Sequence, residues 1–267
     1  FGFLEFGKIA IPLIIICMLS VLIVIKLIIK RLRIPTRMAY LISIGSTVCG
    51  TTAIMATAPI IKANKNEVSY AIANITLFGI LSMLLYPYFA NIYFDGNSLF
   101  AGLFLGTAIH ETSQVAAAGL IYDQQFNSPE TLNVATITKL IRNTFLIIMI
   151  PVFALLYNRG LTKEKNYSIL NIFPYFVLGF VAMIIFRNIG DEVFIANYND
   201  NWIDIINFIE TGSKIFLTMA MAAIGLSTNL KDIKSMGYKP FIVGFVAMIT
   251  VGLVSILTIE IYLQVFI

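Results

Sequence analysis

One short stretch of this otherwise apolar sequence holds side chains that could move a proton. Residues 107–119, "TAIHETSQVAAAG", contain His110, Glu111 and Gln114. A partly buried histidine or glutamate can titrate near neutral pH, so His110 and Glu111 are candidates for coupling protons to another process. The stretch also resembles the HExxH zinc motif. However, Gln114 replaces the second histidine and the sequence has no other, so we expect no metal site.

A second stretch places positive charge inside an apolar run. Residues 138–145, "TKLIRNTF", contain Lys139, Arg142 and Asn143. An ionisable side chain at the centre of a bilayer costs roughly 2.5–3.5 kcal/mol on insertion scales, so it normally faces a cavity or a partner. We expect both cations to supply charge for an anion, because a planar guanidinium matches sulfate-like or carboxylate groups. Two alternatives stay open: the cations could extend to the outer headgroups, or one could form a purely structural ion pair with Glu111.

The elements that position these side chains are transmembrane helices. Of the 267 residues, 59% are hydrophobic and only 12% are charged, and apolar runs of about 20 residues recur. The runs are continuous, which excludes an alternating β-barrel pattern. The net charge of +4 comes without any nucleic-acid-binding signature, so we expect no nucleic-acid partner. Cys17 and Cys49 both lie inside apolar segments, where reduced thiols are the expectation.

The whole chain, residues 1–267, reads as one all-α integral membrane domain with about eight spans. The segments are 9–29, 39–61, 68–90, 99–121, 132–157, 169–187, 203–226 and 240–265. Lysines and arginines collect after the first, fifth and seventh segments, which predicts cytoplasmic loops there and both termini outside. Lys62 and Lys65, which follow the second segment, are the exception to this topology.

Two of the segments contain residues that weaken helices. Residues 45–61, "GSTVCGTTAIMATAPII", combine two glycines and a proline with hydroxyl side chains, and residues 218–230, "TMAMAAIGLSTNL", have a similar texture. Unwound backbone is tolerated in hydrocarbon only where it is buried in protein or lines a wet cavity. Close helix packing through small residues is the alternative. Because the two segments cross in opposite directions, they predict an inverted repeat with two crossed, discontinuous helices and a site near the midplane.

Four stretches together carry a family resemblance: "GSTVCGTTAIMATAPIIKA", "LFGILSMLLYP" with "GTAIHETSQVAAAG", "ATITKLIRN", and "AMAAIGLSTNLKDIKSMGYKP". In this order, over nearly the whole chain, they resemble the YeiH-like family of bacterial membrane proteins, commonly labelled sulfate exporters. The resemblance implies an inverted-repeat transporter in the bacterial inner membrane, similar to the bile-acid sodium symporter and NhaA architectures. Because the family carries further helices before residue 9, it also implies that two to three N-terminal helices are missing here.

The sequence and the resemblance together predict a secondary transporter, and in the family's terms an exporter, of a small inorganic or organic anion such as a sulfate-like oxyanion. Helix N-termini at the interruptions, with their positive partial charge and unpaired N–H groups, suit such a ligand. The predicted substrate site consists of Ser46, Thr47, Cys49, Gly50, Thr51, Thr52, Gln114, Lys139, Arg142, Gly225, Ser227 and Thr228. His110 and Glu111 are the predicted coupling residues, for a proton or sodium.

Other functions have less support from the sequence. A sodium or proton antiporter on the same architecture would use unwound carbonyls, hydroxyls and Glu111, and would leave Lys139 and Arg142 structural. An intramembrane enzyme would need a nucleophile or a metal set beside His110 and Glu111, so we expect neither an enzyme nor a cofactor. A passive scaffold would leave the charges at the midplane unexplained. The expected partners are the anion, a coupling ion and the lipid bilayer, and a homo-oligomer is compatible with the sequence.

Overall fold

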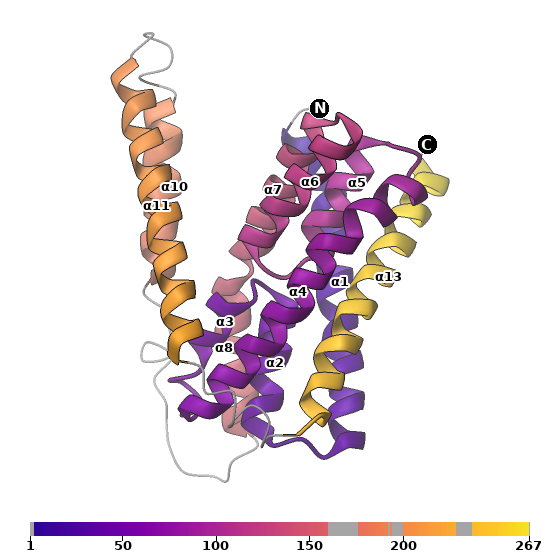
Figure 1. Ribbon diagram of the computed structural model, residues 1–267, viewed down its shortest axis with the longest axis vertical. Coiled ribbons are helices and arrows are strands. Elements are labelled where there is room, and N and C mark those ends of the chain that lie inside the picture. Colours follow the sequence, from indigo (N-terminus) through magenta and orange to yellow (C-terminus); the bar gives the residue numbers. More distant parts are fainter. Residues whose placement is uncertain (1–2, 160–175, 192, 194–199, 228–236, 267) are drawn as a thin grey trace.

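The computed structural model describes residues 3–159, 176–191, 193, 200–227 and 237–266, and the regular structure in these residues is helical (Figure 1). The helices are α1 (Phe3–Leu32), α2 (Thr36–Thr47), α3 (Thr51–Thr57), α4 (Lys65–Tyr93), α5 (Ser98–Ala108), α6 (Thr112–Phe126), α7 (Pro129–Thr144), α8 (Leu146–Arg159), α10 (Phe176–Gly190), α11 (Asp200–Ser227) and α13 (Lys239–Phe266). Among them α1, α4 and α13 are each long and apolar enough to cross a membrane. Helices α7 and α8 together pass the same test, with a bend of 41° between them.

Local sequence signals set several of the helix ends. Helix α4 begins at a capping box, in which the Asn64 side chain accepts from the Glu67 amide and the Glu67 carboxylate accepts from the Asn64 amide, both at 2.8 Å. The Asn97 side chain caps the start of α5. Pro129 occupies the first turn of α7, where its missing N–H costs nothing.

Helices α4 and α13 run in parallel. Four side chains of α4, taken in order, donate to successively later positions in and just before α13: Tyr70 to the Gly237 carbonyl (3.0 Å), Asn74 to the Pro240 carbonyl (2.7 Å), Tyr86 to the Met248 carbonyl (2.9 Å) and Tyr93 to the Glu260 carboxylate (2.7 Å). Both helices begin at the end of the bundle where α1 ends, which we call the basic end because Lys30, Lys65 and Lys239 lie there (Figure 1). Both chain termini lie at the opposite end.

Helices α2 and α3 form a re-entrant hairpin, here called the first hairpin. A Cβ atom on Gly45 would lie 2.9 Å from Cδ1 of Ile54. Nine residues of continuous helix would separate these two positions by about 13 Å, so α3 must fold back along α2. The chain enters this hairpin from the basic end after α1 and returns to the same end, where α4 begins at Lys65.

Helices α5 and α6 form a second hairpin that enters from the opposite end. Gly102 of α5 lies against Val134, and Gly106 lies against Thr138, so α5 runs parallel to α7. Helix α6 runs the other way, because Thr112 at its start contacts Asn143 near the end of α7, whereas Gly119 in its middle lies against Leu132 near the start of α7. Figure 1 shows α5, α6 and α7 clustered at this end of the bundle.

The two hairpins correct the predicted topology. Segments 39–61 and 99–121 do not each cross the bundle; each turns back at its middle, because the backbone breaks there. Lys62 and Lys65, directly before and at the start of α4, therefore lie at the same end as Lys30 and Lys239, and the exception to the charge rule disappears. The two interrupted segments are therefore 39–61 and 99–121, as hairpins from opposite ends, whereas the predicted pair of crossed, discontinuous helices was 45–61 and 218–230.

Helices α10 and α11 lie to one side of these elements (Figure 1). They meet near Asp191, whose carboxylate accepts from Trp202 Nε1 and Arg187 Nε, both at 2.9 Å. These two donors hold the pKa of Asp191 below its ordinary value. Helix α11 continues without interruption to Ser227. The rest of the predicted break at 218–230, including Thr228, lies outside the described residues.

Candidate functional site

The tips of the two hairpins meet inside the bundle. The first tip is Val48–Gly50 and the second is Ile109–Glu111. Gly50 has φ 67° and ψ −125°, a conformation that favours glycine, and this residue lets the chain reverse. The Glu111 carboxylate accepts the Thr51 N–H of the other hairpin at 3.2 Å. A Cβ on Gly50 would lie 2.5 Å from Glu111 Cγ, so the tips are in direct contact.

Lys139 of α7 binds both tips. Its side chain is fully buried, and Nζ donates to the carbonyls of Val48 (3.1 Å), Ile109 (3.0 Å) and His110. An ammonium has three N–H donors, and each has an acceptor here. Because the acceptors come from both hairpins, one side chain joins the two tips.

Arg142, one turn further along α7, binds the last turns of α2 and α5. It is 1% exposed. Nε donates to the Thr47 carbonyl (3.0 Å), and Nη2 donates to the carbonyls of Ser46 and Thr47 (2.8 Å each). Nη1 donates to the carbonyls of Thr107 (2.6 Å) and Ile109 (3.4 Å). The last carbonyls of a helix have no partner within it and carry the negative end of its dipole. Lys139 and Arg142 therefore satisfy and neutralise both helix ends.

These contacts decide between the alternatives left open by the sequence. Neither cation extends to the headgroups, because both are buried in protein. Within the part of the chain that the structure describes, neither makes an ion pair with Glu111, whose carboxylate faces the Thr51 amide. The guanidinium fork of Arg142, expected to face an anion, instead faces backbone carbonyls.

The sequences around the two tips match position by position, a similarity that the sequence prediction missed. Residues 45–52 read "GSTVCGTT" and residues 106–113 read "GTAIHETS". In this register glycine, a small hydroxyl residue, a β-branched apolar residue and two hydroxyl residues recur. The end of α2 at Thr47 aligns with the end of α5 at Ala108. The partner of the first interruption is therefore 106–113, and comparing these two octapeptides directly would have found it.

Among the described residues, several buried polar atoms at and beside the tips have no hydrogen-bond partner. They are Ser46 Oγ, both ring nitrogens of His110, Gln114 Oε1 and Asn143 Oδ1. Asn143 Nδ2 donates to Thr112 Oγ1 at 3.1 Å, at the start of α6. Thr112 was not predicted as a site residue, and its position directly after the tip was the available signal. Unpaired buried polar atoms of this kind are typical of sites that bind water or a ligand.

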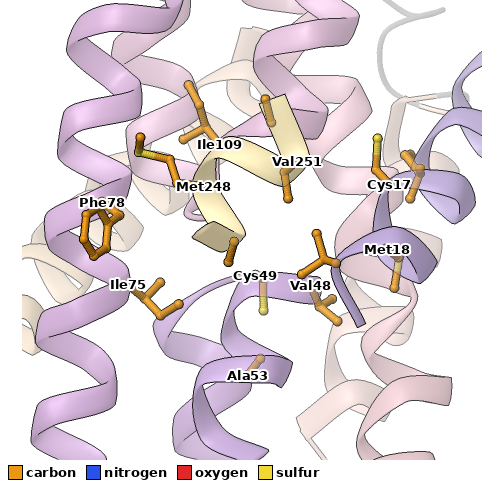
Figure 2. Packing of buried hydrophobic residues seen from close by; sticks show 14 of the residues in the cluster. Cys17, Met18, Val48, Cys49, Ala53, Ile75, Phe78, Ile109, Met248 and Val251 are labelled. Atoms are coloured by element: carbon orange, nitrogen blue, oxygen red, sulfur yellow. The ribbon is translucent and has the colours of Figure 1, made fainter. Parts of the chain in front are cut away.

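Two further contacts support the tips from outside. Thr107 and Ser255 of α13 share a hydrogen bond at 2.6 Å, and both side chains are fully buried. Figure 2 shows Val48 and Cys49 of the first tip, Ile109 of the second, and Met248 and Val251 of α13 in one apolar cluster. The place where the two tips meet, here called the crossing, is thus enclosed by close-packed side chains.

The structure brings nine of the predicted site residues together, and four more of the described ones are not part of this group. Ser46, Thr47, Cys49, Gly50, Thr51, His110, Glu111, Lys139 and Arg142 lie at the crossing. Gln114, one turn into α6, donates to the Thr76 carbonyl of α4 at 3.3 Å. Thr52 is exposed. Gly225 and Ser227 belong to α11, an uninterrupted helix beside the other helices of the bundle (Figure 1).

The comparisons with known proteins agree on one family of membrane proteins. The model of the family described as conserved hypothetical protein 698 matches residues 2–244. The chain is 36% identical to a UPF0324 membrane protein of Fusobacterium nucleatum over 260 residues, which cover 95% of this chain and 75% of that one. It is 36% identical to one of Streptococcus pyogenes over 254 residues (94% and 72%), and 32% identical to one of Clostridium tetani over 242 residues (85% and 66%).

No solved structure matches this chain. The family description and the names of these relatives state a membrane location and no activity. The apolar spans of the structure agree with that location. In agreement with the YeiH-like character of its motifs, this chain belongs to the conserved hypothetical protein 698 family of UPF0324 membrane proteins.

Proposed function

We propose that this protein is a secondary transporter of a small anion, of the class of sulfate-like oxyanions, in the bacterial inner membrane. One observation carries the proposal: the described residues at the crossing hold more buried positive charge than negative charge. Lys139 and Arg142 supply two positive charges and Glu111, when ionised, one negative charge. The partial charges of two helix C-termini and two helix N-termini, roughly half a charge each, cancel. A surplus of about one positive charge remains, which an anion would compensate.

The groups available to bind that anion differ from those first expected. The N–H groups of Lys139 and Arg142 already donate to carbonyls, so the two cations act through their charge. Helix α6 offers the N–H groups of its first turn, residues 112–114, which have no acceptor within the helix. The Thr112 hydroxyl and the amide of Asn143 lie beside them. Backbone N–H groups at a helix start suit an oxyanion.

The arrangement of the hairpins supports alternating access. One hairpin enters from each end of the bundle, and their tips meet at the crossing. Movement of either hairpin would open the crossing to its own side of the membrane. Glu111 is placed to couple a proton to this movement, because its carboxylate joins the two tips through the Thr51 amide. Protonation would weaken that bond and increase the positive surplus.

The cation antiporter alternative receives less support. Backbone carbonyls at the breaks are the groups that would bind sodium, and Lys139 and Arg142 occupy them. The other buried acceptors beside the crossing, such as Gln114 Oε1, form no cluster of carboxylates in the described part of the chain. We therefore prefer the anion.

The proposal is tested with the purified full chain. Thermal unfolding is recorded in sodium salts of sulfate, phosphate, formate, acetate and chloride at constant ionic strength, and uptake of the stabilising anion is then measured in proteoliposomes. We expect at least one oxyanion to raise Tm above the chloride value by several degrees, since a bound ligand stabilises the folded state. Arg187→Gln, which removes only an exposed ion pair, is the control and should keep the response. Equal Tm in every salt together with no flux would refute the proposal.

A further inference from the structure

The carbonyl groups around Lys139 have the composition of a cation site. Val48 O, Ile109 O and His110 O converge on a single point from two separate hairpins. Val48 O and Ile109 O occupy the same place in the two matching octapeptides. Carbonyl oxygens arranged in this way replace the hydration shell of monovalent cations in ion-conducting proteins. In this chain the group at that point is the protein's own ammonium.

We propose that the crossing is a backbone-lined site for a monovalent cation, and that Lys139 permanently supplies the cation. The site consists of the three carbonyls, and its ligand class is an alkali-metal ion or a primary alkylammonium. In the native chain the ammonium occupies the site, so the crossing needs no free ion. Removing the ammonium while leaving room in its place would create a site that binds a free cation.

The geometry explains why a tethered cation suits this position. Lys139 is fully buried and its three donors match three acceptors, so the ammonium loses no hydrogen bond when it leaves water. The carbonyl ends of α2 and α5 both point to the crossing, and without positive charge they would repel each other. Lys139 is on α7, so the stabilising charge is supplied by an element outside both hairpins.

On the proposed transport function, the filled carbonyl site limits which ion can be coupled to transport of the anion. If the carbonyl site is always filled, sodium has no place at the crossing, and a proton at Glu111 is the remaining coupling ion. Transport by the native protein should then be independent of sodium. The cation site itself does not depend on this consequence, since it can be measured by stability alone.

The test compares Lys139→Ala with Lys139→Met in the full chain. Alanine leaves a space the size of propylammonium, whereas methionine is uncharged but fills most of that space. Tm of each variant and of the native protein is measured in choline chloride and then in sodium, potassium or propylammonium chloride. Chloride is common to all four salts, so the anion response of the proposed function stays constant. We expect sodium, potassium or propylammonium to raise the Tm of Lys139→Ala by roughly 5 °C, with no change in Lys139→Met or the native chain.

Three outcomes would overturn the proposal. One is a Lys139→Ala protein that folds and responds to none of the cations. Another is an equal response from Lys139→Met. The third is a sodium-dependent rise in the Tm of the native chain, because its site would then not be filled. If Lys139→Ala cannot be purified in choline chloride, its yield in propylammonium chloride is measured instead of the melting curve. If Lys139→Ala also cannot be purified in propylammonium chloride while Lys139→Met can be purified, the result counts against the site. None of these outcomes changes the anion response of the native chain, which tests the proposed function separately.

Discussion

The Glu111 carboxylate extends from the second hairpin to the Thr51 N–H of the first, at 3.2 Å, directly over Gly50. The absence of a side chain at Gly50 makes this contact possible, because a Cβ there would lie 2.5 Å from Glu111 Cγ. The backbone of Gly50 is also left-handed, with φ 67°. Two separate demands, on space and on conformation, therefore require glycine at this tip.

We predict that Gly50→Ala destabilises the protein by about 1–3 kcal/mol from backbone strain alone, with a further loss from the contact with Glu111. The free energy of unfolding in the four proteins of a double-mutant cycle with Glu111→Ala separates the two. Glu111→Ala should relieve the contact and leave the strain. Full rescue by Glu111→Ala would show that the φ of Gly50 carries no strain.

A second prediction concerns the guanidinium of Arg142. Lysine at this position keeps the charge but cannot reach the carbonyls of Ser46, Thr47 and Thr107 together. We expect Arg142→Lys to lower the stability by about 2–5 kcal/mol, because buried carbonyls of both hairpins lose their donors. Arg142→Gln should in addition abolish the anion-dependent rise in Tm, because it removes the positive surplus. An Arg142→Gln protein with an unchanged anion response would show that this charge does not serve the anion.

The sequence was sufficient to predict one backbone break and a group of charged side chains beside it, but not the second break or the topology. Glycines and hydroxyls in residues 45–52 identified one backbone break, and His110, Glu111, Lys139 and Arg142 were predicted to lie in protein because charge in hydrocarbon is costly. Hydropathy could not show that segments 39–61 and 99–121 turn back, since a re-entrant hairpin and a crossing helix have the same composition. Lys62 and Lys65 were the signal: under the hairpin topology they follow the charge rule.

The roles of the two cations could not be predicted either. A buried lysine or arginine can bind a ligand, an acid or a carbonyl, and the choice depends on which helix ends lie beside it. That arrangement follows from the packing of α5 on α7 through Gly102 and Gly106, which only the folded chain shows. The predicted contribution of Gly225 and Ser227 was based on texture alone, and both residues lie in the uninterrupted helix α11.

A third prediction concerns three helical glycines that differ in how closely a neighbouring element packs against them. A Cβ on Gly106 would lie 2.6 Å from the Ala135 carbonyl oxygen, and backbone cannot rotate away. A Cβ on Gly79 would meet only the side chain of Gln114, which can move at the loss of its bond to Thr76. Among the described atoms, none lies within 4 Å of the Cβ position of Gly212 in α11.

We therefore expect Gly106→Ala to be the most damaging of the three, by about 2–4 kcal/mol, and Gly79→Ala to cost about 1 kcal/mol. Gly212→Ala should be neutral or stabilising by up to about 1 kcal/mol, since alanine favours a helix. Unfolding midpoints in denaturant give the order. Equal losses at Gly106 and Gly212 would contradict the close packing of α5 on α7.

The last prediction tests the hairpin topology in the membrane. Lys65→Cys, Lys239→Cys and Asp95→Cys place a thiol at the start of α4, the start of α13 and the turn before α5. The native Cys17 and Cys49 are buried and should react little with a membrane-impermeant maleimide. If segment 39–61 turns back, Lys65→Cys and Lys239→Cys are labelled from the same side and Asp95→Cys from the other. If it crosses, as hydropathy alone indicated, Lys65→Cys is labelled from the side opposite to Lys239→Cys. Labelling of intact cells against inverted vesicles distinguishes the two patterns without any assumption about the transported anion.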